Sequence, residues 1–312
     1  MFEEIAVVDY EQRKRGARLK RVCAVVVTYN RLSLLKACID ALKRQSAPCD
    51  LCVVDNASTD GTHAWLTQAD VPSLRLETNL GGAGGFNRGI RYAVEKGYDF
   101  VWLMDDDTLV REDALERLLE ADATLGMEYG WLSSVALWTD GSVCLMNRQK
   151  LKKGDDPYLP LLEYGILQAQ QATFVSLFLP TSTIRKVGNV IQDFFIWGDD
   201  VEYTRRISIR SHMPCFLVGK SKVVHAMKEN NGSSISIDSV ERLSRYHYAF
   251  RNENYLYRQE GLRGVMYYYA KCGLQLLRIV RHAKDARMKR IWIVLREMIA
   301  GLFFNPPVER FG

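Results

Sequence analysis

The stretch Phe100-Val101-Trp102-Leu103-Met104-Asp105-Asp106-Asp107 joins a hydrophobic run directly to three consecutive carboxylates. Like charges repel one another and are costly to gather beside a core, unless a cation neutralises them. On an extended backbone, residues i and i+2 point to the same side, so Asp105 and Asp107 are expected to bind one divalent metal while Asp106 faces elsewhere. A hard metal held by oxygens is suited to a diphosphate. The alternative is a solvated acidic turn with Asp107 or Thr108 near a helix cap.

Around this stretch, short apolar runs alternate with segments of helical spacing. Strands are expected at residues 22–28, 51–54, 74–77 and 100–104, and helices at residues 32–44, 61–68, 85–95 and 112–121. The alternation predicts βαβ units and an α/β fold with a mostly parallel sheet, in which ligands bind at the carboxyl ends of strands. Later segments are expected to be extended at 131–137, 172–179, 215–218 and 221–224 and helical at 201–209, and an edge strand is expected at 5–8 in the N-terminal leader.

Polar residues follow the first two expected strands. Thr28-Tyr29-Asn30-Arg31 stands where a dinucleotide-binding fold would have G-x-G-x-x-G, and no P-loop motif occurs, which argues against NAD binding and P-loop nucleotide hydrolysis. Tyr29 is suited to stack on a base, although a helix cap at Asn30 or Ser33 explains the same residues. Asp55, which ends the second strand, is suited to accept a hydrogen bond from the imide N–H of a base.

A glycine-rich motif, Asn79-Leu80-Gly81-Gly82-Ala83-Gly84-Gly85, follows the third expected strand. Glycines before a helix let the backbone approach a ligand closely, and the N-terminus of the helix favours an anion. A flexible loop with a purely structural role is the alternative.

A second acidic motif, Trp197-Gly198-Asp199-Asp200-Val201-Glu202, follows an apolar segment and opens an expected helix. Neighbouring carboxylates in a partly dry site raise one another's pKa, which suits a general base; acids that complement the helix dipole are the alternative. His225 ends another extended segment and is a candidate third metal ligand, whose nitrogen favours Mn²⁺ over Mg²⁺. An aspartyl phosphatase is a rival hypothesis for Asp105-x-Asp107, but it needs Thr or Val where Leu109 stands.

The ordered set of these motifs, from Thr28-Tyr29-Asn30-Arg31 to His225, resembles the family 2 inverting glycosyltransferases over residues 21–230. The glycine-rich motif and the W-x-D-D-x-E pattern are most similar to the galactofuranosyltransferase branch, and rhamnosyltransferases share much of the pattern. The resemblance implies a GT-A fold, with a leader at 1–20, a catalytic domain at 21–237 and a C-terminal helical region at 238–312. Gly198 departs from related enzymes that carry a bulkier or acidic residue, so the acceptor contacts do not transfer safely.

The resemblance also implies roles for individual residues. A divalent cation, Mn²⁺ or Mg²⁺, would be held by Asp105, Asp107 and His225. The nucleotide-sugar donor would be bound by Thr28, Tyr29, Arg31, Asp55, Asn79, Gly84, Gly85 and Asp106. The acceptor would be positioned by Trp197, Asp199 and Glu202, with Asp200 as the base. Inversion is a one-step displacement, so one base for the acceptor hydroxyl and one cation for the leaving diphosphate are sufficient.

Composition and charge point to where such an enzyme would work. Seven scattered cysteines favour a reducing cytosol, and packing explains the pair Cys49 and Cys52 better than zinc does. We expect no signal peptide and no membrane span. Residues 242–312 hold 14 Lys and Arg against 5 Asp and Glu, mixed with aromatics. This tail is expected to bind the cytoplasmic membrane surface rather than nucleic acid; packing on the catalytic domain or on a second subunit is the alternative.

The sequence therefore predicts a metal-dependent glycosyltransferase, peripheral at the inner face of the cell membrane, that extends a lipid-linked cell-surface polysaccharide. UDP-galactofuranose is the favoured donor and dTDP-rhamnose the near alternative. A catalytically inactive, membrane-associated scaffold is the rival that is not an enzyme.

Overall fold

Strand β1 (Val22–Thr28) is buried along its whole length, as its unbroken apolar run predicts. It pairs in parallel with β2 (Asp50–Asp55) and β4 (Phe100–Asp105), and β2 pairs in parallel with β3 (Ser73–Arg75). These four parallel strands bring the polar residues that follow each strand to one edge of the sheet. The computed structural model describes residues 20–154, 156–230 and 232–312.

The second half of the sheet contains antiparallel strands. Its members are β5 (Thr108–Val110), β6 (Leu132–Leu137), β7 (Lys150–Leu151), β8 (Ile166–Gln171), β9 (Leu177–Pro180) and β10 (Phe216–His225). The strand order is β3-β2-β1-β4-β9-β6-β10-β8-β7, and β5 pairs with β10 off this path. Strand β9 runs antiparallel between β4 and β6, whereas β10 is parallel to β6. The α/β fold class is confirmed, and β9 joins its two halves.

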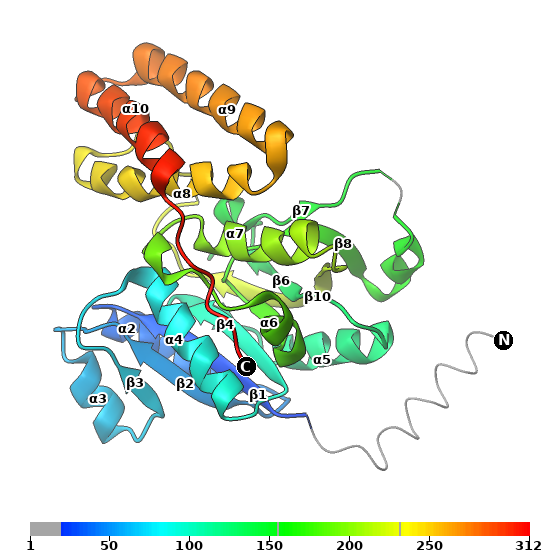
Figure 1. Cartoon of the computed structure of the whole chain (residues 1–312). Coiled ribbons are helices and arrows are strands. Elements are labelled where there is room, and N and C mark those ends of the chain that lie inside the picture. Colours follow the sequence, from blue (N-terminus) through cyan, green and yellow to red (C-terminus); the bar gives the residue numbers. More distant parts are fainter. Residues whose placement is uncertain (1–19, 155, 231) are drawn as a thin grey trace.

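Helices cover both faces of the sheet, as the burial of every residue of β1 requires (Figure 1). On one face, Ala24 and Val26 pack in a core with residues of α2 (Leu32–Lys43), α3 (Thr62–Gln68) and α5 (Ala114–Leu125). On the other, Cys23 and Val25 share a core with residues of α4 (Gly81–Glu95), α6 (Thr181–Val187) and α7 (Asp199–Arg205).

The glycine-rich motif is mostly helix, which corrects the expected helix at 85–95. Helix α4 begins at Gly81, and its glycines let it lie close to the sheet. A β-carbon on Gly85 would come within 2.5 Å of Val27, and one on Gly89 within 2.2 Å of Val25. Close helix–strand packing, which needs residues without a side chain, is therefore what several of these glycines provide.

Three other expectations from the sequence were wrong in detail. The expected strand 172–179 starts only at Leu177 with β9, because β8 ends at Gln171 and Ser176 has a φ of 65°. The extended segments 215–218 and 221–224 form one strand, β10, with a bulge. The expected helix 201–209 is α7 followed by a π-helix, Arg206–Arg210. The leader and the expected strand 5–8 lie outside the described residues, apart from Lys20.

The C-terminal region is helical, and it has a hydrophobic cluster of its own. Its elements are a 3₁₀ turn, η5 (Val240–Arg245), and the helices α8 (Tyr246–Arg258), α9 (Gly261–His282) and α10 (Arg287–Phe303). In Figure 1 these helices are stacked beyond one end of the sheet, and the chain after α10 returns along the catalytic part. Ile235, which precedes the expected boundary near residue 238, packs in the same cluster. The position of that boundary stays a prediction.

The returning chain is bound to the catalytic part. Phe304, Val308 and Phe311 pack against the core on the α4 side of the sheet, and the N–H of Asn189 donates to the carbonyl of Glu309 at 2.9 Å. Within the described parts of the chain, no helix is both long and apolar enough to cross a membrane. All seven cysteines are free thiols, and Cys52 is buried in β2, in line with a packing role.

Candidate active site

Three possible metal ligands meet at the carboxyl end of β4. Ligand atoms of Asp105, Asp107 and His225 all lie within 4.8 Å of one another. The chain turns after Asp105 and continues as β5, whose Thr108 is opposite His225 in the antiparallel pair with β10. The geometry thus comes from a turn and a long-range strand pair, and the expected extended arrangement of the acidic triplet was wrong.

Asp106 is not one of the three clustered ligands, and its side chain contacts other residues. Its carboxylate accepts a hydrogen bond from the hydroxyl of Thr28 at 2.7 Å, and Nη1 of Arg31 lies 3.3 Å from it. The same Nη1 is 2.7 Å from Oδ2 of Asp107. Two of the predicted donor-binding residues, Thr28 and Arg31, therefore contact the acidic triplet directly.

The site holds more negative charge than its neighbours neutralise. Desolvation raises the pKa of Asp105 to about 7, and the nearby charge of Asp107 adds to the effect. Desolvation also raises the pKa of Asp106 to about 6, although Thr28 and Arg31 oppose the shift. A divalent cation would relieve this repulsion, so the residues present fit a metal.

Asn147, which the sequence did not single out, orients His225. Its Oδ1 lies 2.8 Å from Nδ1 of His225, and its amide nitrogen donates to the hydroxyl of Thr173 at 2.8 Å. Because Oδ1 can only accept, Nδ1 must carry a proton, and Nε2 then faces Asp107 at 2.9 Å. A partner of this kind fixes the ring and the tautomer of a metal-binding histidine.

The surroundings of His225 shift its pKa in opposite directions. Burial lowers the pKa, whereas the hydrogen bonds to Asp107 and Cys144 and the charges of Asp107 and Asp105 together raise it to about 10. A cation bound at Nε2 would displace a proton from this nitrogen.

Asp55 has an oxygen in need of a partner. The side chain is fully buried at the end of β2, and its Oδ1 accepts the N–H of Ser58 at 2.9 Å. Oδ2 has no hydrogen-bond partner in the described part of the chain. A buried, unpaired acceptor is costly, so it favours a ligand that donates a hydrogen bond there. The exposed ring of Tyr29 follows β1, the strand next to β2.

Asp199 and Asp200 begin α7, and they interact electrostatically with Asp105 of the metal cluster. Desolvation raises the pKa of Asp200 to about 6 and raises that of Asp199 further, with the charge of Asp200 contributing. The charge of Asp200 also raises the pKa of Asp105. Carboxylates from the two acidic motifs, far apart in sequence, are thus within electrostatic reach of one another.

Glu202 was predicted to bind the acceptor, and this prediction was wrong. Its side chain is 2% exposed and makes a two-pronged ion pair with Arg206, one turn further along the helix, while Arg210 lies 3.5 Å away. A carboxylate paired in this way is part of the core. Trp197 is half-buried against Tyr246, with ring centroids 4.8 Å apart, and its acceptor role stays a prediction.

The donor roles of Asn79, Gly84 and Gly85 are also changed. Oδ1 of Asn79 accepts the N–H of Gly81 at 2.8 Å, so the side chain supports the start of α4. A β-carbon on Gly84 would come within 2.4 Å of Leu80, and Gly85 lies against Val27. Gly84 and Gly85 therefore serve packing, because both are buried inside the helix instead of in a loop beside a ligand.

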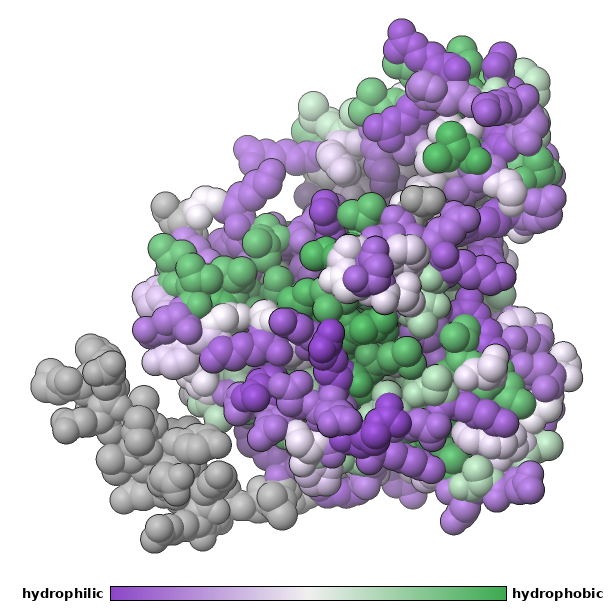
Figure 2. All heavy atoms as spheres, turned by 180° about the vertical axis from the view of Figure 1, so that it is seen from behind, coloured by the Kyte–Doolittle hydropathy of each residue, from purple (hydrophilic) through white to green (hydrophobic). Residues whose placement is uncertain are grey.

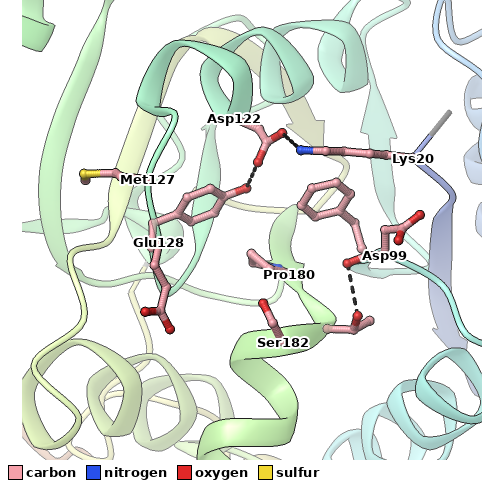
Figure 3. Close-up of a pocket in the computed structure, with 10 residues that line it drawn as sticks. Lys20, Asp99, Asp122, Met127, Glu128, Pro180 and Ser182 are labelled. Carbon is pink, nitrogen blue, oxygen red and sulfur yellow. Dashed lines mark hydrogen bonds and ion pairs between the residues drawn. The ribbon is translucent and has the colours of Figure 1, made fainter. Parts of the chain in front are cut away.

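A cavity of about 310 Å³ lies at the other end of β4, beside Asp99 and Phe100 (Figure 3). Its Asp122 is already bonded to Lys20 at 2.6 Å and to the hydroxyl of Tyr129 at 3.1 Å. This cavity is separate from the candidate active site, because the length of β4 lies between it and the acidic triplet. Its acid, Asp122, is also already paired.

Comparison with known proteins defines the class. Residues 23–127 match the family model described as glycosyl transferase family 2. The galactofuranosyltransferase GlfT1 of Mycolicibacterium smegmatis is 28% identical over 269 residues, covering 78% of this chain and 85% of that protein. The dTDP-rhamnosyl transferase RfbF of Shigella flexneri is 36% identical over 99 residues, covering 31% of this chain and 33% of that protein.

The fold agrees with these relatives. The crystal structure of GalNAc-T7 with UDP, GalNAc and Mn²⁺ superposes with a TM-score of 0.63 at 14% identity, over 94% of this chain and 59% of that one. A glycosyltransferase with a GT-A fold is the class to which these matches point. Residues 23–127 carry the family 2 glycosyltransferase match, and over most of its length the chain is similar to a glycosyltransferase. The aspartyl phosphatase hypothesis has no support from these matches.

We predict that Asn147→Ala weakens Mn²⁺ binding by about 10- to 100-fold, because the orientation and basicity of His225 depend on this partner. Calorimetric titration of Mn²⁺ in the presence of UDP measures the change. The matched control is Gln149→Ala, two residues after Asn147. It removes a hydrogen bond from the Gln149 side chain to the carbonyl of Ser134. Equal Mn²⁺ affinity of Asn147→Ala and wild type would contradict the assignment.

Proposed function

We propose that the protein transfers galactofuranose from UDP-galactofuranose to a lipid-linked glycan, with inversion and with the help of a divalent cation. The observation that carries the proposal is the convergence of Asp105, Asp107 and His225 with Asp200 at one edge of the sheet. The sugar is favoured because the similarity to GlfT1 extends over most of both chains. The local similarity to RfbF makes dTDP-rhamnose the second candidate.

In this proposal, Asp200 removes the proton from the acceptor hydroxyl. Its pKa near 6 leaves the carboxylate ionised at neutral pH, yet more basic than an ordinary aspartate. As that proton moves, the acceptor oxygen forms a bond to the anomeric carbon, and the bond from this carbon to the diphosphate breaks on the opposite side.

The leaving nucleoside diphosphate takes up the electron pair of the broken bond. A cation bound by Asp105, Asp107 and His225 would supply charge stabilisation for this group. Arg31 is half-exposed beside the same carboxylates and is free on its open side to contact a phosphate. The unpaired oxygen of Asp55 would accept the imide N–H of uracil, which also exists in thymine, so this contact selects the base class but not the sugar.

The outer faces of α9 and α10 support a membrane contact. On α10, exposed apolar residues recur every three or four positions, namely Met288, Trp292, Leu295, Ile299 and Leu302. A similar stripe on α9 consists of Leu262, Met266, Tyr269, Leu277 and Val280. Figure 2 shows apolar side chains interspersed with hydrophilic ones over this region at the top of the molecule. Apolar stripes among Arg and Lys suit an anionic lipid surface, where a lipid-linked acceptor would be found.

We predict that wild-type enzyme with Mn²⁺ hydrolyses or transfers UDP-galactofuranose in preference to dTDP-rhamnose, because the similarity to GlfT1 is the more extensive one. Release of UDP or dTDP from a panel of nucleotide sugars measures the preference. A preference for dTDP-rhamnose would replace the proposed donor with the second candidate. No turnover of any donor by folded protein would favour the inactive scaffold.

We predict that Asp200→Asn abolishes transfer while UDP binding with Mn²⁺ stays close to that of wild type, because an amide cannot accept the proton. Initial rates and calorimetry on the same preparation separate the two effects. Asp193→Asn, an exposed acid shortly before the motif, is the matched control and should keep its rate. Transfer retained by Asp200→Asn would exclude this residue as the base.

We predict that the double variant Trp292→Glu with Ile299→Glu binds phosphatidylglycerol vesicles about 100-fold more weakly, since burial of two such side chains contributes about 3 kcal/mol. Both residues are more than half exposed, so folding is preserved. Cosedimentation with phosphatidylglycerol and with phosphatidylcholine vesicles measures the effect. The control is Leu159→Glu, which changes an equally exposed residue of the catalytic part. If wild type is a dimer, and the double variant is a monomer that binds vesicles as wild type does, the face would be assigned to contact with a second copy instead.

A further inference from the structure

The segment that leads into the Asp199-Asp200 pair has an unusual backbone. Phe195 has a φ of 62° and a ψ of −64°, and Trp197 has a φ of 64°. Residues with side chains rarely adopt these conformations, which cost about 1–3 kcal/mol each and persist only where the surroundings hold them. Gly198, at a φ of 83°, completes the turn directly before α7. Something must therefore hold residues 194–198 in place.

Asn252 of α8 holds this segment from one side. Its side-chain amide nitrogen lies within hydrogen-bond distance of three backbone carbonyls, 2.9 Å from Phe194, 3.2 Å from Ile196 and 2.8 Å from Trp197. Asn252 is fully buried, and its Oδ1 accepts from the guanidinium of Arg251 at 2.9 Å. The amide is thus fixed with its N–H groups pointing at the strained turn.

The start of α4 holds the same segment from the other side. The N–H of Ala83 donates to the carbonyl of Phe195 at 3.1 Å. Gly81 allows this approach, because a β-carbon at this position would lie only 2.0 Å from that carbonyl oxygen. The glycine-rich motif is therefore joined to the turn before the catalytic pair by a direct hydrogen bond.

Aromatic rings of α8 add to the contact with the turn. The rings of Phe195 and Tyr248 are stacked with centroids 4.9 Å apart, and Trp197 meets the edge of Tyr246. The first half of α8 therefore supplies the amide and both rings that contact this turn, although it belongs to the C-terminal helical region.

We propose that Asn252 is a positioning residue that sets the direction of Asp200 by holding the carbonyls of residues 194, 196 and 197. The proposal rests on the proposed role of Asp200 as the base. Rotation of the turn would rotate the first residues of α7 and move the carboxylate away from the acceptor hydroxyl. The helical region thus takes part in catalysis through α8, in addition to any contact of α9 and α10 with lipid.

The test is Asn252→Ala, which removes the two N–H donors that the three carbonyls share. We expect kcat to fall about 100-fold, as a shift of about 1 Å in a reacting group does, whereas the affinity for UDP with Mn²⁺ is unchanged. Initial rates with UDP-galactofuranose, or with the donor that wild type prefers, give kcat, and calorimetry gives the affinity. A loss of stability alone would not lower kcat while leaving the affinity for UDP with Mn²⁺ unchanged.

Asn254→Ala is the matched control. Asn254 is equally buried two residues further along α8, and its amide donates to the carbonyl of Met298 at 2.8 Å, so it joins α8 to α10. This variant should lose stability while the folded enzyme keeps the kcat of wild type. Equal kcat losses in the two variants, or an unchanged kcat in Asn252→Ala, would overturn the positioning role.

A second variant applies if Asn252→Ala does not fold. Arg251→Met removes the guanidinium that holds Oδ1 of Asn252 and that also donates to the carbonyl of Asp193 at 2.7 Å. Methionine keeps apolar cover over the ring of Phe304. A reduced kcat with unchanged UDP affinity supports the proposal, and an unchanged kcat overturns it. Failure of wild type to turn over any donor would instead overturn the proposed function, before any variant is compared.

Discussion

The repulsion among acidic side chains at one edge of the sheet is the constraint on which the rest of the structure depends. Asp105, Asp106 and Asp107 meet the Asp199-Asp200 pair where desolvation raises the pKa of several of these groups. Only a rigid frame can keep such charges together, and four parallel strands with helices on both faces provide it. In the proposed function, the free energy lost in gathering the charges would be recovered as affinity for a cation and as basicity at Asp200.

The sequence predicted those parts of the site that depend on the pattern of neighbouring residues along the chain. Apolar runs that end in polar residues identified β1, β2 and β4, and with them Asp55 and the acidic triplet. Asn147 and Asn252 could not be found in this way, because each acts through partners more than fifty residues away and lies in a segment without a distinctive pattern. Glu202 was misassigned for a related reason: its pairing with Arg206 depends on the depth at which α7 is buried.

The glycine-rich motif shows how one pattern can have two physical causes. Sequence reasoning treated close approach to a ligand as the reason for the glycines, whereas most of them approach other parts of the chain. Gly85 and Gly89 bring α4 against β1, and Gly81 admits the carbonyl of Phe195. Absence of a side chain indicates that something comes near, but only the tertiary structure tells what that neighbour is.

The segment after α10 contacts residues that are synthesised much earlier, which affects how the core is completed. The carboxylate of Glu309 lies 3.1 Å from the amide nitrogen of Asn87, 3.0 Å from that of Asn189, and 2.6 Å from the guanidinium of Arg91. These three groups leave the ribosome long before residue 309 does. The side of the core that carries α4 therefore stays incomplete until the residues after α10, which are made later, return to it.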